Sequence, residues 1–248
     1  MTVWVAARVV SQRGGGARRG SESARGARRA VEALWPSRAP VRPSGAGPEQ
    51  ARATVDVIAR ENPFSVGRVL AVRYRFLEGG WEDLCARLHE LECRGAIVGP
   101  EGSGKTTLLE DLAKELERRG RSVSFVTLSA GERRLSSRQR GVVLTAARSD
   151  SFLLVDGADA LTPRDWRALH RRGRRAGGFV VTAHAEGLLP TLWRTRTSPD
   201  LLAETVRALT GAGSEAFDRP AEDLFRSHGG NLREALRELY DVCAEGSR

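Results

Sequence analysis

The sequence predicts an α/β fold, in which a mostly parallel five-stranded sheet lies between two layers of helices and a small helical lid follows. Two observations predict it. From Trp81 onward, short apolar runs of strand length alternate with segments whose apolar residues recur at helical spacing, which is typical of a parallel sheet covered on both faces. After residue 197, helical periodicity alone continues to the end of the chain and predicts the lid.

The individual elements follow from local patterns. The predicted strands are the short apolar or alternating runs 96–98, 122–128, 152–156, 179–182 and 191–197. Residues 81–91 and 105–119 each carry one apolar helical face, and Gly120 is expected to end the second helix. Thr162 is predicted to cap a further helix, with Pro163 in its first turn. The lid helices are predicted over 198–210, 220–228 and 232–243.

Composition divides the chain into three parts. Residues 1–50 are rich in Gly, Arg, Ser and Pro and hold few apolar anchors, so we expect a disordered tail that cannot offset its ordering entropy. Residues 51–197 are expected to form the core domain, with Phe64 and Val69 packing at its edge. Residues 198–248 are expected to form the lid.

The basic balance of the chain does not by itself indicate a nucleic-acid partner. The formal net charge is +9, but residues 1–50 hold nine arginines and three glutamates, so the remaining residues carry only +3. Arginine supplies 38 of the 40 basic residues, a skew that is typical of biased coding. Because the core is nearly neutral, nucleic-acid binding is not implied.

The cysteines and the hydropathy indicate a cytoplasmic protein. Cys85, Cys93 and Cys243 give an odd count without CxxC spacing, which predicts reduced thiols. No apolar run approaches the roughly 18 residues that a membrane-spanning helix needs, so we expect no membrane span.

Residues 99–106 read GPEGSGKT and fit the phosphate-loop pattern GxxxxGK[ST] in full. The glycines let successive backbone N–H groups converge on a phosphate, and the following helix adds its positive end. We expect Lys105 to reach the β- and γ-phosphates of a nucleoside triphosphate, and the Thr106 hydroxyl to bind magnesium. The residues expected to contact the nucleotide are Gly99, Pro100, Glu101, Gly102, Ser103, Gly104, Lys105, Thr106 and Thr107.

The second half of such a site is an acid at the end of a neighbouring strand. The run FLLVD supplies Asp156, which we expect to hold magnesium through water. Guanine is read by an NKxD-type motif, and neither lysine of the chain stands in one. ATP with Mg²⁺ is therefore the expected ligand.

These motifs resemble the P-loop NTPases of the additional-strand division, which includes AAA+ proteins and their signalling relatives. The resemblance implies that the strand ending at Thr182 lies between the two motif strands, and that Thr182 acts as a polar sensor with His184 just beyond it. Residues 229–236 (GGNLREAL) are similar to the lid motif whose arginine touches the γ-phosphate, a role that would fall on Arg233.

One departure from the family pattern concerns hydrolysis. These ATPases usually place Glu directly after the magnesium Asp, whereas this chain has Gly157 there. The nearest carboxylates are Asp159 and Glu101, either of which could polarise the attacking water. Lys105, Asp159, Glu101 and Arg233 are therefore the candidate catalytic residues.

Three kinds of function remain open at this point. The first is an ATPase used as a switch or motor-like module, in which a homo-oligomer or protein partner could complete the site, with Arg194 and Arg196 as candidate arginines in trans. The second is a nucleotide-responsive binding module that does not hydrolyse ATP. The third is a small-molecule or nucleotide kinase, in which arginines after the second strand, such as Arg133 and Arg138, would hold an acceptor phosphate.

Overall fold

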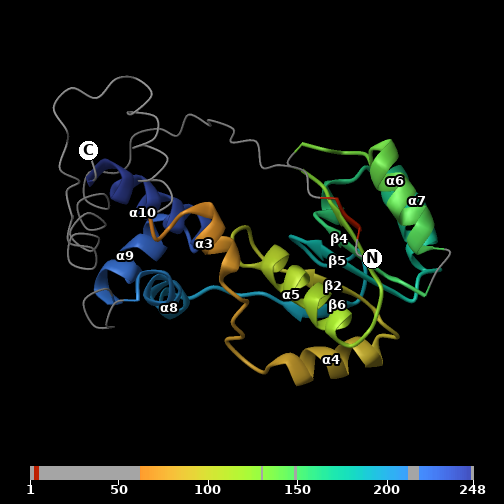
Figure 1. The fold of residues 1–248 in the computed structure, drawn as a ribbon, viewed down its shortest axis with the longest axis horizontal. Coiled ribbons are helices and arrows are strands. Elements are labelled where there is room, and N and C mark those ends of the chain that lie inside the picture. The colour runs from red at the N-terminus through yellow and green to blue at the C-terminus, as the bar shows by residue number, and fades with distance from the viewer. Residues whose placement is uncertain (1–2, 6–61, 130, 148–149, 212–217, 247–248) are drawn as a thin grey trace. The chain divides into compact units, whose positions relative to one another are not determined.

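The computed structural model describes residues 3–5, 62–129, 131–147, 150–211 and 218–246 of the 248-residue chain (Figure 1). Contacts divide these residues into two units. The first comprises residues 3–5 and 74–196, and the second comprises residues 62–73 together with the described residues from 197 onward. None of the described helices has the length and apolar character needed to cross a membrane.

The first unit is built on a six-stranded sheet in the order β1-β3-β4-β5-β2-β6, and every described pairing is parallel. The strands are β1 (Val3–Val5), β2 (Arg94–Val98), β3 (Val123–Thr127), β4 (Phe152–Asp156), β5 (Gly178–Ala183) and β6 (Thr191–Arg194). In a parallel sheet covered on both faces the strands are continuously apolar, which explains runs such as the wholly buried β5. The predicted fold class is confirmed, and β5 does lie between β4 and β2.

Two layers of helices cover this sheet (Figure 1). They are α4 (Trp81–Glu90), α5 (Lys105–Arg118), α6 (Ser137–Ala146) and α7 (Pro163–Gly173), with a short 3-10 turn η1 (Ala158–Ala160) after β4. Successive side chains of β4 point to opposite faces of the sheet and so into two different cores. Phe152 and Leu154 pack with α4 and α5. Leu153 and Val155 pack with α6 and α7 on the opposite face.

The helix starts agree with the capping chemistry of the sequence. The Thr162 hydroxyl accepts a hydrogen bond from the Asp165 backbone N–H at 3.2 Å, and Pro163 occupies the first turn of α7. Ser136 and Gln139 form a reciprocal capping box at the start of α6, which gives this polar, arginine-rich segment a defined helical start.

The second unit is helical and has its own apolar core. Its helices are α3 (Val66–Ala71), α8 (Pro199–Thr210), α9 (Asp218–Ser227) and α10 (Leu232–Gly246). Leu202, Val206 and Leu239 are fully buried in that core. Ser198 caps α8 by accepting a hydrogen bond from the Leu201 N–H at 3.1 Å.

Two features differ from the sequence-based expectations. Val3–Val5 forms a sixth strand paired with β3, although residues 1–50 were expected to be a disordered tail; the rest of that segment lies outside the described residues. Residues 62–73 were assigned to the core domain, but Phe64 is buried in the second unit's core and Val69 packs against it. The Asn62 side chain also donates a hydrogen bond to the Tyr240 carbonyl at 3.0 Å.

Candidate functional site

The glycine loop joins β2 to α5 in the backbone conformation that the sequence requires. Gly102 and Gly104 have φ values of +70° and +84°, and such left-handed backbone is readily adopted only by glycine. Gly104 is the N-cap of α5, which begins at Lys105. The loop therefore stands at the carboxyl end of a central strand and at the positive end of a 14-residue helix.

A buried threonine that follows β6 holds this loop in place. Thr195 is 2% exposed, and its Oγ1 lies 2.6 Å from Ser103 Oγ and 3.3 Å from the Val98 carbonyl. Ser103 Oγ in turn donates to the Pro100 carbonyl at 2.7 Å. A Cβ at Gly99 would lie 2.1 Å from Thr195 Oγ1. The close approach of Thr195 to the loop therefore requires glycine at position 99. The sequence motif alone did not indicate that Thr195 packs against it.

Lys105 is the buried cation of the loop. Its side chain is directed back over the loop, because Nζ donates to the carbonyl oxygens of Gly99 and Pro100, both at 2.7 Å. Lys105 is only 9% exposed, so its ammonium group lies in a region of reduced solvent screening, where its attraction for an anion is strengthened. Glu101 is exposed and Thr107 is half-buried.

The two predicted magnesium ligands meet at the end of the sheet. Thr106 Oγ1 donates to Asp156 Oδ2 at 3.0 Å, although fifty residues separate them. The other carboxylate oxygen, Oδ1, accepts from Thr182 Oγ1 at 2.6 Å. Thr182 is 1% exposed and also accepts from the Gly157 backbone N–H at 2.8 Å. The sheet order therefore brings Thr106, Asp156 and Thr182 together.

Asp159 and His184 form a pair beside these residues. Asp159 Oδ2 accepts from the His184 backbone N–H at 2.8 Å and lies 2.7 Å from His184 Nδ1. Burial alone would raise the pKa of Asp159, but the hydrogen bonds from the backbone and ring of His184 bring it below its ordinary value. The carboxylate is ionised at neutral pH and can only accept, so Nδ1 carries the hydrogen.

The conformation of Gly157 accounts for the departure from the usual Asp-Glu pair. Gly157 has φ +80°, and a Cβ there would lie 3.4 Å from the Leu128 carbonyl oxygen. A glutamate would be strained in this left-handed conformation. The chain turns at Gly157 into η1, and this turn carries Asp159 to the His184 backbone.

Two further residues near the site were not predicted from the sequence. Glu110 is half-buried on α5, one turn after Thr106; burial and the negative charge of Asp156 raise its pKa, although Lys114 opposes this. A Cβ at Gly104 would lie 3.3 Å from the Tyr74 ring. The signal for Tyr74 was the aromatic cluster of Tyr74, Phe76, Trp81 and Trp193, whose rings meet edge to face at about 5 Å.

The second unit holds the remaining predicted residue in a polar helix start. Arg233 is exposed near the beginning of α10, where the Asn231 side-chain oxygen accepts from its backbone N–H at 3.1 Å. The turn before it carries Gly229 and Gly230, with φ of +57° and +84°. The contact of Arg233 with a γ-phosphate stays a prediction.

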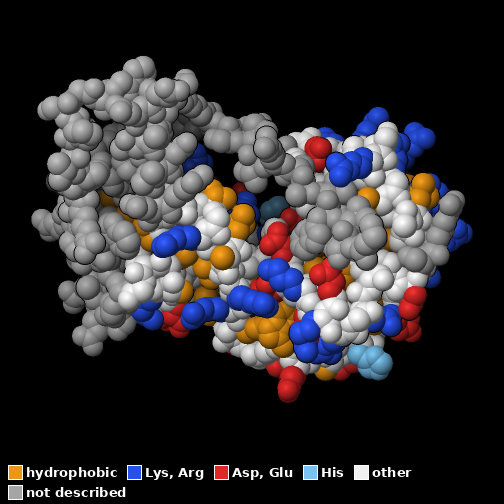
Figure 2. Space-filling model, in the orientation of Figure 1, with side chains coloured by type: hydrophobic (Ala, Val, Ile, Leu, Met, Phe, Trp, Pro, Cys, Tyr) orange, Lys and Arg blue, Asp and Glu red, His pale blue; other side chains and the backbone are white. Residues whose placement is uncertain are grey.

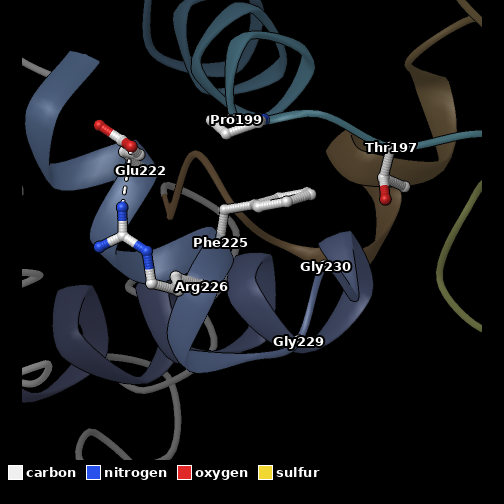
Figure 3. A pocket seen from close by; sticks show the side chains of 7 residues that line it. All are labelled: Thr197, Pro199, Glu222, Phe225, Arg226, Gly229 and Gly230. Carbon is white, nitrogen blue, oxygen red and sulfur yellow. Dashed lines mark hydrogen bonds and ion pairs between the residues drawn. The ribbon is translucent and has the colours of Figure 1, made fainter.

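A pocket of ≈ 450 Å³ lies in the second unit beside this glycine turn (Figure 3). Its lining residues are Thr197, Pro199, Glu222, Phe225, Arg226, Gly229 and Gly230. The Phe225 ring extends between Pro199 and Gly230, and the Glu222–Arg226 ion pair of 2.8 Å closes one side. A Cβ at Gly230 would lie 3.2 Å from the Phe225 ring, so glycine is needed at this corner.

The two arginines that could act on a second subunit lie at the end of the edge strand β6 and just after it. Arg194 and Arg196 are exposed and form ion pairs with Glu186 and Glu78 respectively, the second at 3.5 Å. Among the described residues their ion-pair partners are carboxylates on the surface, and exposed ion pairs of this kind contribute little to stability. Their role toward a second subunit stays a prediction.

Comparison with known families gives a match that spans the glycine loop and Asp156. Residues 96–193 match the sequence profile of the "ATPase family associated with various cellular activities (AAA)". This segment is a P-loop NTPase domain of the AAA+ type. The AAA domain thus contains the glycine loop, Asp156, Thr182 and the Asp159–His184 pair.

Comparison with individual proteins adds one structural likeness. The solved structure of C. elegans PCH-2 is similar with a TM-score of 0.40 and 13% sequence identity, over 80% of this chain and 67% of that chain. No curated protein matches the sequence of the chain. The family match indicates an ATP-binding ATPase domain.

Proposed function

We propose that the chain binds Mg²⁺·ATP at the 99–106 loop and hydrolyses it slowly, as a nucleotide-dependent switch or motor-like module in the cytoplasm. One observation carries this proposal above the others. The Thr106 hydroxyl and the Asp156 carboxylate, which come from different motifs, lie 3.0 Å apart at the mouth of the loop. That is the arrangement in which P-loop NTPases hold the metal against the β- and γ-phosphates.

The donor set suits magnesium. Mg²⁺ prefers oxygen ligands and is usually bound by one or two carboxylates together with substrate phosphates. Thr106 and Asp156 offer one hydroxyl and one carboxylate, and among the described residues no group of three or more His, Cys, Asp and Glu side chains forms a separate metal cage. When bound, the metal would neutralise charge that develops on the phosphates.

The chain's own groups would bind and orient the triphosphate. The backbone N–H groups of the loop and the amino end of α5 favour the phosphate oxygens. Lys105 would exchange its two carbonyl acceptors for phosphate oxygens, which are stronger acceptors because they are charged. Thr182 would fix Asp156 through the 2.6 Å hydrogen bond.

For the attacking water, we infer that His184 is the base and Asp159 its orienting partner. Asp159 was a candidate base in its own right, but its lowered pKa makes it a weak proton acceptor. With the hydrogen on Nδ1 held by Asp159, a neutral His184 ring has Nε2 unprotonated and able to accept a proton from water. This geometry has the same logic as the carboxylate that orients a catalytic histidine in hydrolytic triads.

A nucleotide-responsive module without hydrolysis is the second candidate function. It is favoured by Gly157, which leaves no carboxylate directly after Asp156. A kinase is less well supported: Arg133 and Arg138 are exposed, and β3 ends at Thr127 without a carboxylate to act on an acceptor hydroxyl.

Steady-state phosphate release, measured with ATP and Mg²⁺ on the full chain, separates these functions. The proposal expects slow turnover that falls at least about tenfold in His184→Ala, equivalent to ~1.4 kcal/mol, with ATP binding retained. His170→Ala is a matched control, because His170 lies on α7 away from the loop. ATP binding without turnover in the wild type would favour the second function, and turnover only with an added acceptor would favour the kinase.

A further inference from the structure

Helix α7 concentrates positive charge on its exposed surface. Residues 163–175 contain six arginines and one aspartate, whereas all the residues after 50 together carry a net charge of only +3. The side chains of five of these arginines are exposed: Arg164, Arg167, Arg171, Arg174 and Arg175. We name these five residues the α7 arginine face.

The arginines fall on one side of the helix. At 3.6 residues per turn, positions 164, 167, 171 and 174 lie within about 80° of arc and span about 15 Å along the axis. The opposite side packs on the sheet, where Leu169 is buried and a Cβ at Gly173 would lie 2.8 Å from the Phe179 ring. The arginine face is therefore directed away from the core.

Within the described part of the chain, no carboxylate forms an ion pair with these five guanidinium groups. The nearby acids have other partners: Asp165 accepts from the Thr162 hydroxyl and pairs with Arg134 at 3.8 Å. Asp150 pairs with Arg121 at 3.3 Å. Exposed arginines elsewhere do pair with acids at 2.7–2.9 Å, as in Arg87, Arg118, Arg119 and Arg226.

Helix stability does not explain this arrangement. Cations in the last turn interact favourably with the helix dipole, but Arg164 lies in the first turn, where a cation is unfavourable. Like charges three or four positions apart, such as Arg167 and Arg171, also repel each other. The α7 arginine face therefore lowers the stability of the helix, which suggests that it serves a function other than folding.

A shallow depression at the carboxyl end of the helix is lined by three of these arginines. It has a volume of ≈ 370 Å³ and is lined by His170, Arg171, Arg174 and Arg175. The His170 ring is held in place by stacking on Trp166, with centroids 5.5 Å apart. Figure 2 shows Lys and Arg side chains along the edge of the molecule that α6 and α7 occupy in Figure 1.

We propose that the α7 arginine face binds the phosphate backbone of double-stranded DNA without reading its sequence. A duplex carries one negative charge per about 1.7 Å of axis, so a stripe of about 15 Å meets several phosphates at once. An acidic peptide is a poorer fit, since protein interfaces depend on buried aromatic or apolar anchors. The exposed large hydrophobic residues of the described chain are Val66, Leu70, Leu77 and Leu144, none of which lies on α7.

The test measures binding of the full chain to a fluorescent duplex of about 20 base pairs by anisotropy, between about 50 and 200 mM salt. The test variant replaces four arginines of the face: Arg164→Ala, Arg167→Ala, Arg171→Ala and Arg174→Ala. The control variant loses the same formal charge at ion-paired sites: Arg87→Ala, Arg118→Ala, Arg119→Ala and Arg226→Ala. Residues 1–50 are present in both, so their nine arginines contribute equally.

We expect the test variant to bind DNA at least about tenfold more weakly at low salt, with a salt slope smaller by about 3–4. The control should stay within about threefold of the wild type, and both variants should keep the wild-type melting temperature and ATP affinity. The proposal is overturned if the two variants weaken equally or if the wild type does not bind the duplex. It is also overturned if poly-glutamate or anionic lipid vesicles, and not DNA, bind in a manner that depends on α7.

Discussion

The Thr182 hydroxyl links the Asp156 carboxylate to the backbone N–H of Gly157, and Thr182→Val tests this link with almost no change of shape. The substitution removes the donor to Asp156 Oδ1 at 2.6 Å and the acceptor of the Gly157 N–H at 2.8 Å. At 1% exposure, no solvent can replace either bond. A hydrogen bond to a charged group contributes about 1.5–3 kcal/mol and a neutral one about 0.5–1.5 kcal/mol.

The free energy of unfolding should therefore fall by about 2–4 kcal/mol in Thr182→Val. Urea denaturation followed by tryptophan fluorescence measures it, because Trp81, Trp166 and Trp193 all lie in the first unit. Thr182→Ser keeps the hydroxyl and loses only the methyl group, so it should cost only about 1 kcal/mol.

Thr145→Val is the matched control for this prediction. Thr145 lies exposed on α6, and its hydroxyl donates to a carbonyl of its own helix, the Gly141 oxygen at 3.1 Å. We expect a change within about 0.5 kcal/mol there. If Thr182→Val were no more destabilising than Thr145→Val, the proposed support of Asp156 by Thr182 would be wrong.

Three further predictions follow from other contacts. Gly99→Ala places a Cβ 2.1 Å from Thr195 Oγ1, so it should weaken ATP binding at least about tenfold and destabilise the fold by about 1–3 kcal/mol; Gly141→Ala, where a Cβ meets nothing within 4 Å, should do neither. Burial raises the pKa of Cys243 to about 11, so alkylation at pH 8 should be at least about a hundredfold slower in native than in unfolded protein; equal rates would contradict the burial. The pKa of Asp159 is lowered in the fold from 3.8, so its ionised form stabilises the protein above about pH 4 and this stability is lost on acidification; Asp159→Asn should be less stable than wild type at pH 7 in urea titrations, and the difference should narrow toward pH 3.

Local pattern was sufficient for the central strands and the glycine loop. Apart from Asp156 and Thr182 near their carboxyl ends, the runs FLLVD and GFVVTA hold no polar side chain, because both faces of β4 and β5 are covered. The family resemblance then placed Thr182 between the two motif strands, as the pairing of β5 with β4 and β2 confirms.

Residues that act through distant contacts could not be predicted from the sequence. Thr195 meets Ser103 across 92 positions, and no local pattern distinguishes it from any other threonine after a strand. The Asp159–His184 pair depends on the turn at Gly157, which carries the carboxylate to the end of β5. Both residues were candidates from the sequence, but no sequence pattern indicated that they contact each other.

The boundaries of the units depend on tertiary packing rather than on composition. Phe64 is apolar enough for either core, so its sequence does not assign it to a unit. The structure assigns it to the second unit, where it is buried with Leu202 and Leu239. Similarly, Val3–Val5 is too short to stand out within an arginine- and glycine-rich segment. It is a strand because β3 offers it an edge.

The most direct test of the central claim is isothermal titration calorimetry of Mg²⁺·ATP into the full chain and its Lys105→Ala variant. Lys105 Nζ already lies 2.7 Å from two loop carbonyls, so it is positioned to bind a phosphate placed in the loop. We expect saturable heat for the wild type and at least about tenfold weaker binding in the variant, a loss of ~1.4 kcal/mol or more. Absence of heat with every Mg²⁺·nucleotide in folded protein, or equal affinity in Lys105→Ala, would contradict it.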